Sequence, residues 1–234
     1  MSGLYARVHR VCVFLSVQSR GARLKWCREH VNWTVSDWGN VMFTDESRFA
    51  LEPDDKRIRI WREQGTRNQP QTITEHHAFR GGSIMVWAGI SLGYRTDLHI
   101  FKRGSVTAVR YRDEVLEPIV RLYAAAVGPT FVLMDDNARP HRADIVDDYL
   151  ESEGIARMAW PAYSPDLNPI ENLWDALGRA VSSRFPPPAT LIELETALQE
   201  EWRLLNSAVV DHLIESMVTR CKLCIQMRGD HIPY

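Results

Sequence analysis

The feature that most constrains the fold is a near-continuous apolar run, Ser83–Ser91 (SIMVWAGIS), which follows a pair of glycines at 81 and 82. A short run of this kind is typical of a central strand that is buried on both faces of a sheet. Further stretches rich in β-forming residues occur at Val41–Leu51 and Phe131–Met134. Hydrophobic residues make up 45% of the chain, which is enough to build a sizeable core around such a sheet.

The order of the other elements predicts an α/β fold. Three more strands are expected at Arg57–Arg62, where isoleucines alternate with arginines, at Leu98–Phe101 and at Ile155–Trp160. Apolar periodicity with capping and breaking residues predicts helices at 21–31, Thr107–Ala126, Ala143–Ser152, 170–184, 190–205 and 207–226. Strands followed by alternating strands and helices indicate a mixed sheet.

Composition and charge suggest three parts: a short basic segment at 1–40, an α/β domain at 41–184, and a helical extension at 185–234 after the break at Pro186–Pro188. The net charge is only −2, so composition gives no support by itself for a nucleic-acid partner. Basic residues cluster in 1–40 and 56–67, where ordinary solvated surface explains them equally well. No apolar run approaches the length that a membrane span needs.

Four cysteines occur, at 12, 27, 221 and 224. The pair Cys221–Cys224 has CxxC spacing, but no second pair accompanies it at the spacing of a zinc site. On the expected helix both thiols would lie on one face, where free cysteine behaves as a small hydrophobic residue. We therefore expect buried free thiols and a reducing compartment.

Three acidic clusters lie within, after or at the start of these elements. Asp45 lies within the first strand, Asp135 and Asp136 follow the strand that ends at Met134, and Glu171 closes the segment Asp166–Glu171 at the start of a helix. Carboxylates at strand ends and helix starts can converge at one edge of a sheet. Converging oxygens suit Mg²⁺, and a pair of such ions can support phosphoryl transfer.

Each acid also has a structural interpretation. Asp45 with Glu46 could be a charge pair on an edge strand, and Asp135 with Asp136 could belong to a turn. Glu171 fits a capping box, in which Asn168 is the N-cap residue. The residue types alone predict a divalent-metal site and leave these alternatives open.

The same residues carry a resemblance to a known family. Four motifs occur in order, and together they resemble the Tc/mariner superfamily of transposases: Val41–Phe49 (VMFTDESRF), Gly81–Gly89 (GGSIMVWAG), Met134–His141 (MDDNARPH) and Trp160–Trp174 (WPAYSPDLNPIENLW). Weaker similarity occurs at Trp26–Trp38, Pro186–Leu191 and Arg220–Tyr234, so the resemblance runs from about residue 20 to the end. The combination of four ordered motifs is highly specific.

The resemblance implies a ribonuclease-H-like catalytic domain at 41–184, with a mixed five-stranded sheet flanked by helices and a helical C-terminal extension. It assigns the catalytic, metal-binding acids to Asp45, Asp136 and Glu171, with Mg²⁺ as cofactor and Mn²⁺ able to substitute. The 34 residues between the last two match the Tc branch. Asp45 would bridge two ions. Asn137 and His141 would orient substrate or water, and for His141 a structural hydrogen-bonding role is equally expected.

The implied activity is hydrolysis of a phosphodiester at a transposon end, followed by attack of the freed 3′-hydroxyl on target DNA. Expected partners are therefore transposon-end and target DNA. We expect a homodimer on DNA in the nucleus, and neither a membrane nor a small-molecule substrate.

About 40 residues precede Asp45, too few for the paired helix-turn-helix modules of the family. The alternatives are a truncated or domesticated remnant that binds DNA or a transposase without cutting, and, less favoured, a general ribonuclease-H-type nuclease.

Overall fold

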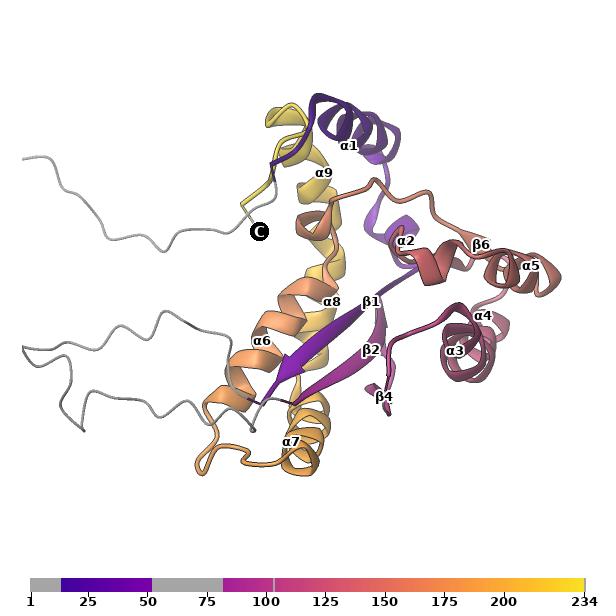
Figure 1. Ribbon diagram of the computed structural model, residues 1–234. Helices are drawn as coiled ribbons and strands as arrows, with labels where there is room; N and C mark the ends of the chain where they lie inside the picture. The colour runs from indigo at the N-terminus through magenta and orange to yellow at the C-terminus, as the bar shows by residue number, and fades with distance from the viewer. Residues whose placement is uncertain (1–13, 52–81, 103, 234) are drawn as a thin grey trace, which may run out of the picture.

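The computed structural model describes residues 14–51, 82–102 and 104–233 (Figure 1). Within these ranges a mixed sheet lies between two groups of helices. Its strands are β1 (Val41–Ala50), β2 (Ser83–Ser91), β3 (Tyr94–Arg95), β4 (His99–Phe101), β5 (Val132–Met134) and β6 (Ala156–Arg157). The strand predicted at Arg57–Arg62 lies outside the described residues.

The sheet has the order β3-β2-β1-β5-β6, and β4 lies off this path and also pairs with β2. β1 and β2 are antiparallel, whereas β1, β5 and β6 run parallel to one another. The predicted mixed α/β architecture is therefore confirmed. The described sheet has six strands where five were expected, because Tyr94–Arg95 folds back on β2 and adds a two-residue strand.

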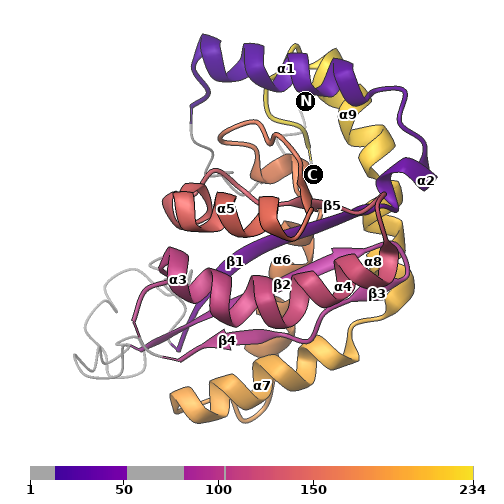
Figure 2. The same cartoon turned by 90° about the vertical axis from the view of Figure 1, so that its right-hand side faces the viewer.

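Helices flank this sheet on both sides, as Figures 1 and 2 show. They are α1 (Val17–His30), α2 (Val35–Trp38), α3 (Ala108–Tyr111), η2 (Arg112–Val120), α4 (Arg121–Val127), η3 (Arg139–Arg142), α5 (Asp144–Ser152), η4 (Pro165–Leu167), α6 (Ile170–Ser182), α7 (Leu191–Leu204), α8 (Ser207–Glu215) and α9 (Met217–Gln226). The segment α3–η2–α4 forms one continuous helical stretch, in agreement with the prediction for Thr107–Ala126. No described helix is long and apolar enough to cross a membrane.

The alternation of side chains along the strands divides the core in two. Phe43 and Val86 point to one face and pack with helices α1, α2 and α6–α9. Met42 and Trp87, their neighbours in sequence, point to the other face and pack with the α3–α4 stretch and α5. Each large apolar side chain buried in this way contributes about 1.5–3 kcal/mol. Burial on both faces explains why Ser83–Ser91 has no polar side.

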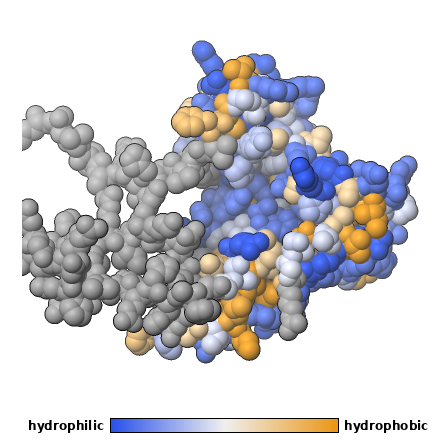
Figure 3. Space-filling model, in the orientation of Figure 1, coloured by the Kyte–Doolittle hydropathy of each residue, from blue (hydrophilic) through white to orange (hydrophobic). Residues whose placement is uncertain are grey.

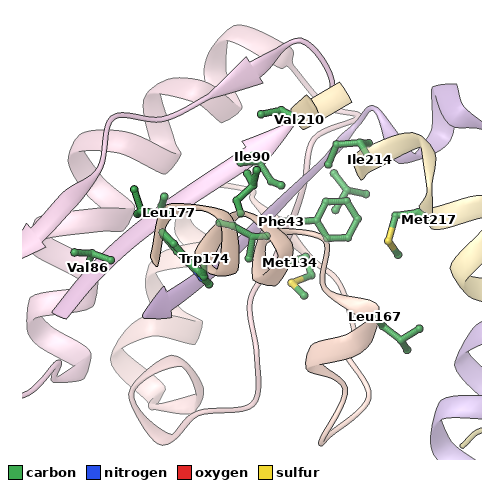
Figure 4. Packing of buried hydrophobic residues seen from close by; sticks show 14 of the residues in the cluster. Phe43, Val86, Ile90, Met134, Leu167, Trp174, Leu177, Val210, Ile214 and Met217 are labelled. Atoms are coloured by element: carbon green, nitrogen blue, oxygen red, sulfur yellow. The ribbon is translucent and has the colours of Figure 1, made fainter. Parts of the chain in front are cut away.

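The larger core joins the C-terminal helices to the sheet (Figure 4). Trp174 and Leu177 on α6 and Ile214 on α8 pack into the same cluster as Phe43. On α9, Cys221 and Cys224 are fully buried free thiols, together with Cys27 of α1. The prediction that the CxxC pair lies on the buried face of a helix is confirmed. The boundaries 1–40, 41–184 and 185–234 stay a prediction, because no observation tests them.

Two expected elements differ from the structure. The single helix expected at 207–226 is two helices, α8 and α9, which meet at Ser216. The Ser216 hydroxyl donates a hydrogen bond to the carbonyl of Leu213, a local bond that competes with regular helix. The strand expected at Ile155–Trp160 is shortened to β6, because its partner β5 ends after three residues.

Candidate active site

Asp45 lies in the middle of β1, just after the point where β5 stops pairing with this strand. The parallel pairing with β5 ends at the Phe43–Met134 pair, whereas the antiparallel pairing with β2 continues past Asp45. Beyond Phe43, β1 therefore has no strand on its β5 side among the described residues. The chain that follows β5 and the start of α6 approach β1 there, and these two segments carry the other predicted acids.

Two hydrogen bonds join the three acid-bearing segments directly beside the acids. The hydroxyl of Thr44 donates to the carbonyl of Met134 at 2.8 Å. The side-chain amide of Asn168 donates to the carbonyl of Thr44 at 3.2 Å. Because both bonds are buried, they hold the main chain before Asp45, Asp136 and Glu171 in a fixed relation.

Glu171 is the second residue of α6, whose apolar residues Leu173 and Trp174 anchor the helix in the core. The capping box predicted from the sequence is not formed. The Asn168 side chain accepts a bond from the N–H of Ile170 at 3.3 Å, but among the described residues the Glu171 carboxylate returns no bond to Asn168. The helix begins one residue later than the box requires, and Glu171 is left to line a cleft.

All three predicted acids line one cleft of about 400 Å³. Its other walls are main-chain and side-chain atoms of Asn137, Ala138, Trp160, Pro161, Ala162, Tyr163, Ser164, Pro165 and Asn168. On the face shown in Figure 3, a hydrophilic hollow lies between α6 and the α3–α5 side of the molecule. The convergence that strand ends and helix starts predict is thus present in the fold.

The charges in this cleft repel one another. Burial raises the pKa of Asp45 well above its usual range, and the negative charges of Glu171, Glu46 and Asp136 raise it further. One donor opposes this shift, the indole N–H of Trp174, which binds Oδ2 of Asp45 at 3.0 Å. The pKa of Glu171 is also raised, first by burial and then by Asp175 and Asp136.

Asp136 has the opposite shift. Burial alone would raise its pKa, but hydrogen bonds from the His141 ring and the Ala138 N–H lower it below the usual value. Both donors bind the same oxygen, Oδ1, at 2.8 Å. The second oxygen, Oδ2, has no partner among the described residues.

His141 forms a bridge that the sequence did not reveal. Its Nδ1 contacts Asp136, and its Nε2 contacts Oε1 of Glu46 at 3.1 Å. Burial works against a charged ring, yet the two carboxylates raise the pKa of His141 to about 10. Glu46 was singled out only as an edge-strand charge, since its partner lies 95 residues further along the chain.

The neighbours of Asp136 have structural partners. The amide of Asn137 donates to the carbonyl of Trp160 at 2.9 Å and so holds the loop that forms the cleft wall. Asp135 is fully buried on the other side, with Arg142 and Arg157 each 3.4 Å from its carboxylate. Burial raises the pKa of Asp135, while these arginines and His141 oppose the shift. The inner acid is therefore surrounded by positive charge, and the outer acid faces the cleft.

The donor set fits a divalent cation of the Mg²⁺ class, because it consists of carboxylate oxygens. A cation among these acids would relieve the repulsion that raises the pKa values of Asp45 and Glu171. Among the described residues, however, no three His, Cys, Asp or Glu side chains stand close enough to hold an ion as they are. Asp45 instead faces Trp174, and Asp136 faces His141. The cleft holds the right ligand type, with side chains that must turn toward an ion.

Comparison with known proteins identifies the family. Residues 40–192 match the model of the DDE superfamily endonucleases. The Tcb1 transposase of Caenorhabditis briggsae is 32% identical over 98% of this chain and 83% of its own length, and the Tc1 transposase of Caenorhabditis elegans is 32% identical over 97% and 82%. The chain is a Tc1/mariner transposase of the DDE superfamily.

Solved structures agree on the fold of this transposase. The Mos1 transposase in a paired-end complex with a left transposon end superposes with a TM-score of 0.80 at 21% identity, over 98% of this chain and 68% of Mos1. The isolated Mos1 catalytic domain, solved with raltegravir and Mg, superposes with a TM-score of 0.71 at 17% identity, over 94% of this chain and 100% of that domain. The predicted ribonuclease-H-like fold and transposase catalytic domain are confirmed.

Proposed function

We propose that this transposase binds two divalent cations with Asp45, Asp136 and Glu171, Mg²⁺ being the natural ion and Mn²⁺ able to substitute. The observation that carries the proposal is that three acids from β1, the end of β5 and the start of α6 line one cleft, joined by buried hydrogen bonds beside each acid. Mos1 complexes solved with Mn and with Mg are consistent with this choice of ions.

Each acid has a distinct part. Asp45 lies centrally, with negative charge from both other acids raising its pKa, so its carboxylate would help to hold the cations and would be relieved of this repulsion by them. Trp174 holds Oδ2 of Asp45, and His141 with Ala138 holds Oδ1 of Asp136. Each contact engages one oxygen of the carboxylate, and the other oxygen would reach an ion once the side chain turns toward it. When bound, the ions stabilise the charge on the attacking and leaving oxygens of a phosphodiester.

The reaction is an in-line displacement at phosphorus. In the first step a water oxygen forms a bond to the phosphorus at the transposon end, the bond from phosphorus to the 3′ oxygen breaks, and the 3′ oxygen takes up a proton. In the second step the oxygen of this 3′-hydroxyl forms a bond to a phosphorus of target DNA and gives up its proton, while the bond from that phosphorus to its own 3′ oxygen breaks and that oxygen takes up a proton. The cleft supplies placement and charge stabilisation, which dominate catalysis of phosphoryl transfer.

The partners follow from this reaction. Transposon-end DNA and target DNA are the substrates, a homodimer on DNA is the working form, and the nucleus is the location. Mos1 structures of a paired-end complex and of a strand transfer complex support a DNA partner for this chain. Dimer and nuclear location rest on the family alone.

The test is nicking of supercoiled DNA by the full chain in Mg²⁺ or Mn²⁺. Asp45→Asn, Asp136→Asn and Glu171→Gln should each lower the rate by about 10³-fold or more, because each removes several kcal/mol of charge stabilisation. Asp148→Asn, an exposed carboxylate on α5, should retain the wild-type rate. If wild type nicks no faster than Asp136→Asn in either ion, the chain is a non-catalytic remnant.

A further inference from the structure

Asp166 is a buried acid five residues before Glu171, in the η4 turn. Arg23 of α1 binds it with both nitrogens of its fork: Nη1 to Oδ1 and Nη2 to Oδ2, each at 2.7 Å. The two side chains are 0% and 3% exposed. A bidentate guanidinium–carboxylate pair fixes direction as well as distance, so Arg23 sets the orientation of the η4 turn.

Arg220 of α9 holds the other side of the same segment. Its Nη1 donates to the main-chain carbonyl of Asp166 at 2.7 Å, and its Nη2 donates to Oδ1 of Asn172 at 2.6 Å. Asn172 follows Glu171 directly in the first turn of α6. One guanidinium therefore links the turn before Glu171 to the residue after it.

The C-terminal tail closes the arrangement. The N–H of Ile232 donates to Oδ2 of Asp166 at 2.8 Å, and Nε of Arg23 donates to the carbonyl of Gly229 at 2.9 Å. Gly229 has φ +82°, and a Cβ there would lie 2.1 Å from the carbonyl oxygen of Arg20, so only glycine lets the tail approach α1. Figures 1 and 2 both place α1 beside α9 at one end of the molecule.

The start of α6 depends on these contacts. Pro169 makes no side-chain capping bond, and among the described residues the Glu171 carboxylate has no hydrogen-bond partner of its own. The position of that carboxylate is therefore set by its main chain. Besides Asn168 and the buried apolar residues of α6, the side chains of Arg23, Asp166 and Arg220 hold this main chain.

We propose that Arg23, Asp166 and Arg220 form a clasp that positions Glu171 for cation binding. Segments from both ends of the chain thereby set the affinity of a site to which they contribute no ligand. The inference rests on the proposed role of Glu171 as a ligand. Outer residues that orient metal ligands typically change metal affinity by about 10–100-fold when they are altered.

The test is direct Mn²⁺ binding to the full chain, measured by titration without DNA and with circular dichroism to confirm folding. Asp166→Asn and Arg220→Gln should each weaken Mn²⁺ binding about tenfold. Arg121→Gln, which breaks an exposed pair with Glu117, is the matched control and should bind like wild type. If Asp166→Asn does not fold, Asn172→Ala replaces it, because this variant removes only the bond from Arg220.

A double-mutant cycle separates positioning from general support. In a Glu171→Gln background the clasp variants should cause no further loss of Mn²⁺ affinity, since the group that they position is gone. An equal loss in both backgrounds, or no loss in either, overturns the clasp. If Glu171→Gln itself leaves Mn²⁺ affinity unchanged, the proposed role of Glu171 fails, which is a different result.

Discussion

Asp166 and Glu171 lie five residues apart in one motif, yet their surroundings have opposite charge. Arg23 binds Asp166 with two hydrogen bonds, and although burial opposes ionisation, these bonds hold the pKa of Asp166 below its usual value. Around Glu171, burial and the negative charges of Asp175 and Asp136 raise the pKa. One acid has all the partners that a buried charge requires, and the other has none among the described residues.

The second motif divides its two acids differently. Asp135 points inward toward Arg142 and Arg157, and Asp136 points to the cleft. Burial raises the pKa of Asp135 although two arginines lie near it, whereas hydrogen bonds from His141 and Ala138 lower the pKa of Asp136. Hydrogen-bond partners, more than burial, therefore decide the direction in which the pKa of these acids shifts. Keeping like charges together in the cleft costs stability and prepares a cation site.

The largest stability effect should come from breaking the partnered acid. Arg23→Met leaves Asp166 buried without its guanidinium, so the free energy of unfolding should fall by about 3–5 kcal/mol. Urea denaturation of the full chain measures this change. An exposed pair is worth far less, and Arg121→Gln should leave the free energy of unfolding nearly unchanged.

A double variant tests whether the unpaired charge of Asp166 causes this loss of stability. Arg23→Met combined with Asp166→Leu removes both charges and fills the space with apolar side chains, so it should regain much of the loss. Recovery would show that the uncompensated charge caused the loss. If Arg23→Met lowers the free energy of unfolding no more than Arg121→Gln does, the contrast between Asp166 and Glu171 is lost.

The cleft acids should respond in the opposite direction. Asp45→Asn removes a negative charge that burial and three neighbouring acids oppose, so the ion-free chain should become more stable by on the order of 1 kcal/mol at neutral pH. Thermal unfolding in EDTA measures this gain. With Mn²⁺ present the order should reverse, because only wild type gains the free energy of binding the ion.

The pH dependence fixes the sign of this effect. The folded-state pKa of Asp45 is raised, so ionised Asp45 destabilises the folded chain. This destabilisation is absent below the unfolded-state pKa near 4 and grows as the pH rises toward the folded-state pKa. Asp166 has a lowered pKa, so its contribution is present above about pH 4 and is lost as the pH falls through the folded value. A gap between Asp45→Asn and wild type that shrinks with rising pH would contradict the assignment.

The sequence predicts the strands and the convergence of acids because both follow from local patterns. The apolar run at Ser83–Ser91 and the acid after Met134 need no knowledge of distant residues. The choice of Asp136 over Asp135 came from the resemblance to transposases, since both follow the same strand. In the structure, Arg157 and Arg142 lie beside Asp135, whereas Asp136 faces the cleft. The spacing of residues along the sequence does not show this difference.

The clasp was missed for a physical reason. Arg23 and Asp166 are 143 residues apart, and Arg220 is 54 residues beyond Asp166, so no periodicity connects them. The capping box failed because α6 begins at Ile170, where Asn168 binds Thr44 of β1 in addition to its own helix. A tertiary contact replaced a local one.

The smallest effect should come from Asp175, an exposed acid one turn after Glu171 on α6. Asp175→Asn removes the neighbouring charge that contributes most to the raised pKa of Glu171, so that pKa should move down toward its usual value. Stability should change by less than about 0.5 kcal/mol, because the substitution is on the surface. Carboxyl-carbon NMR of the ion-free chain measures the titration of Glu171. If its midpoint stays the same, Asp175 does not influence the charge of Glu171, and the contrast with Asp166 then rests on burial and Asp136.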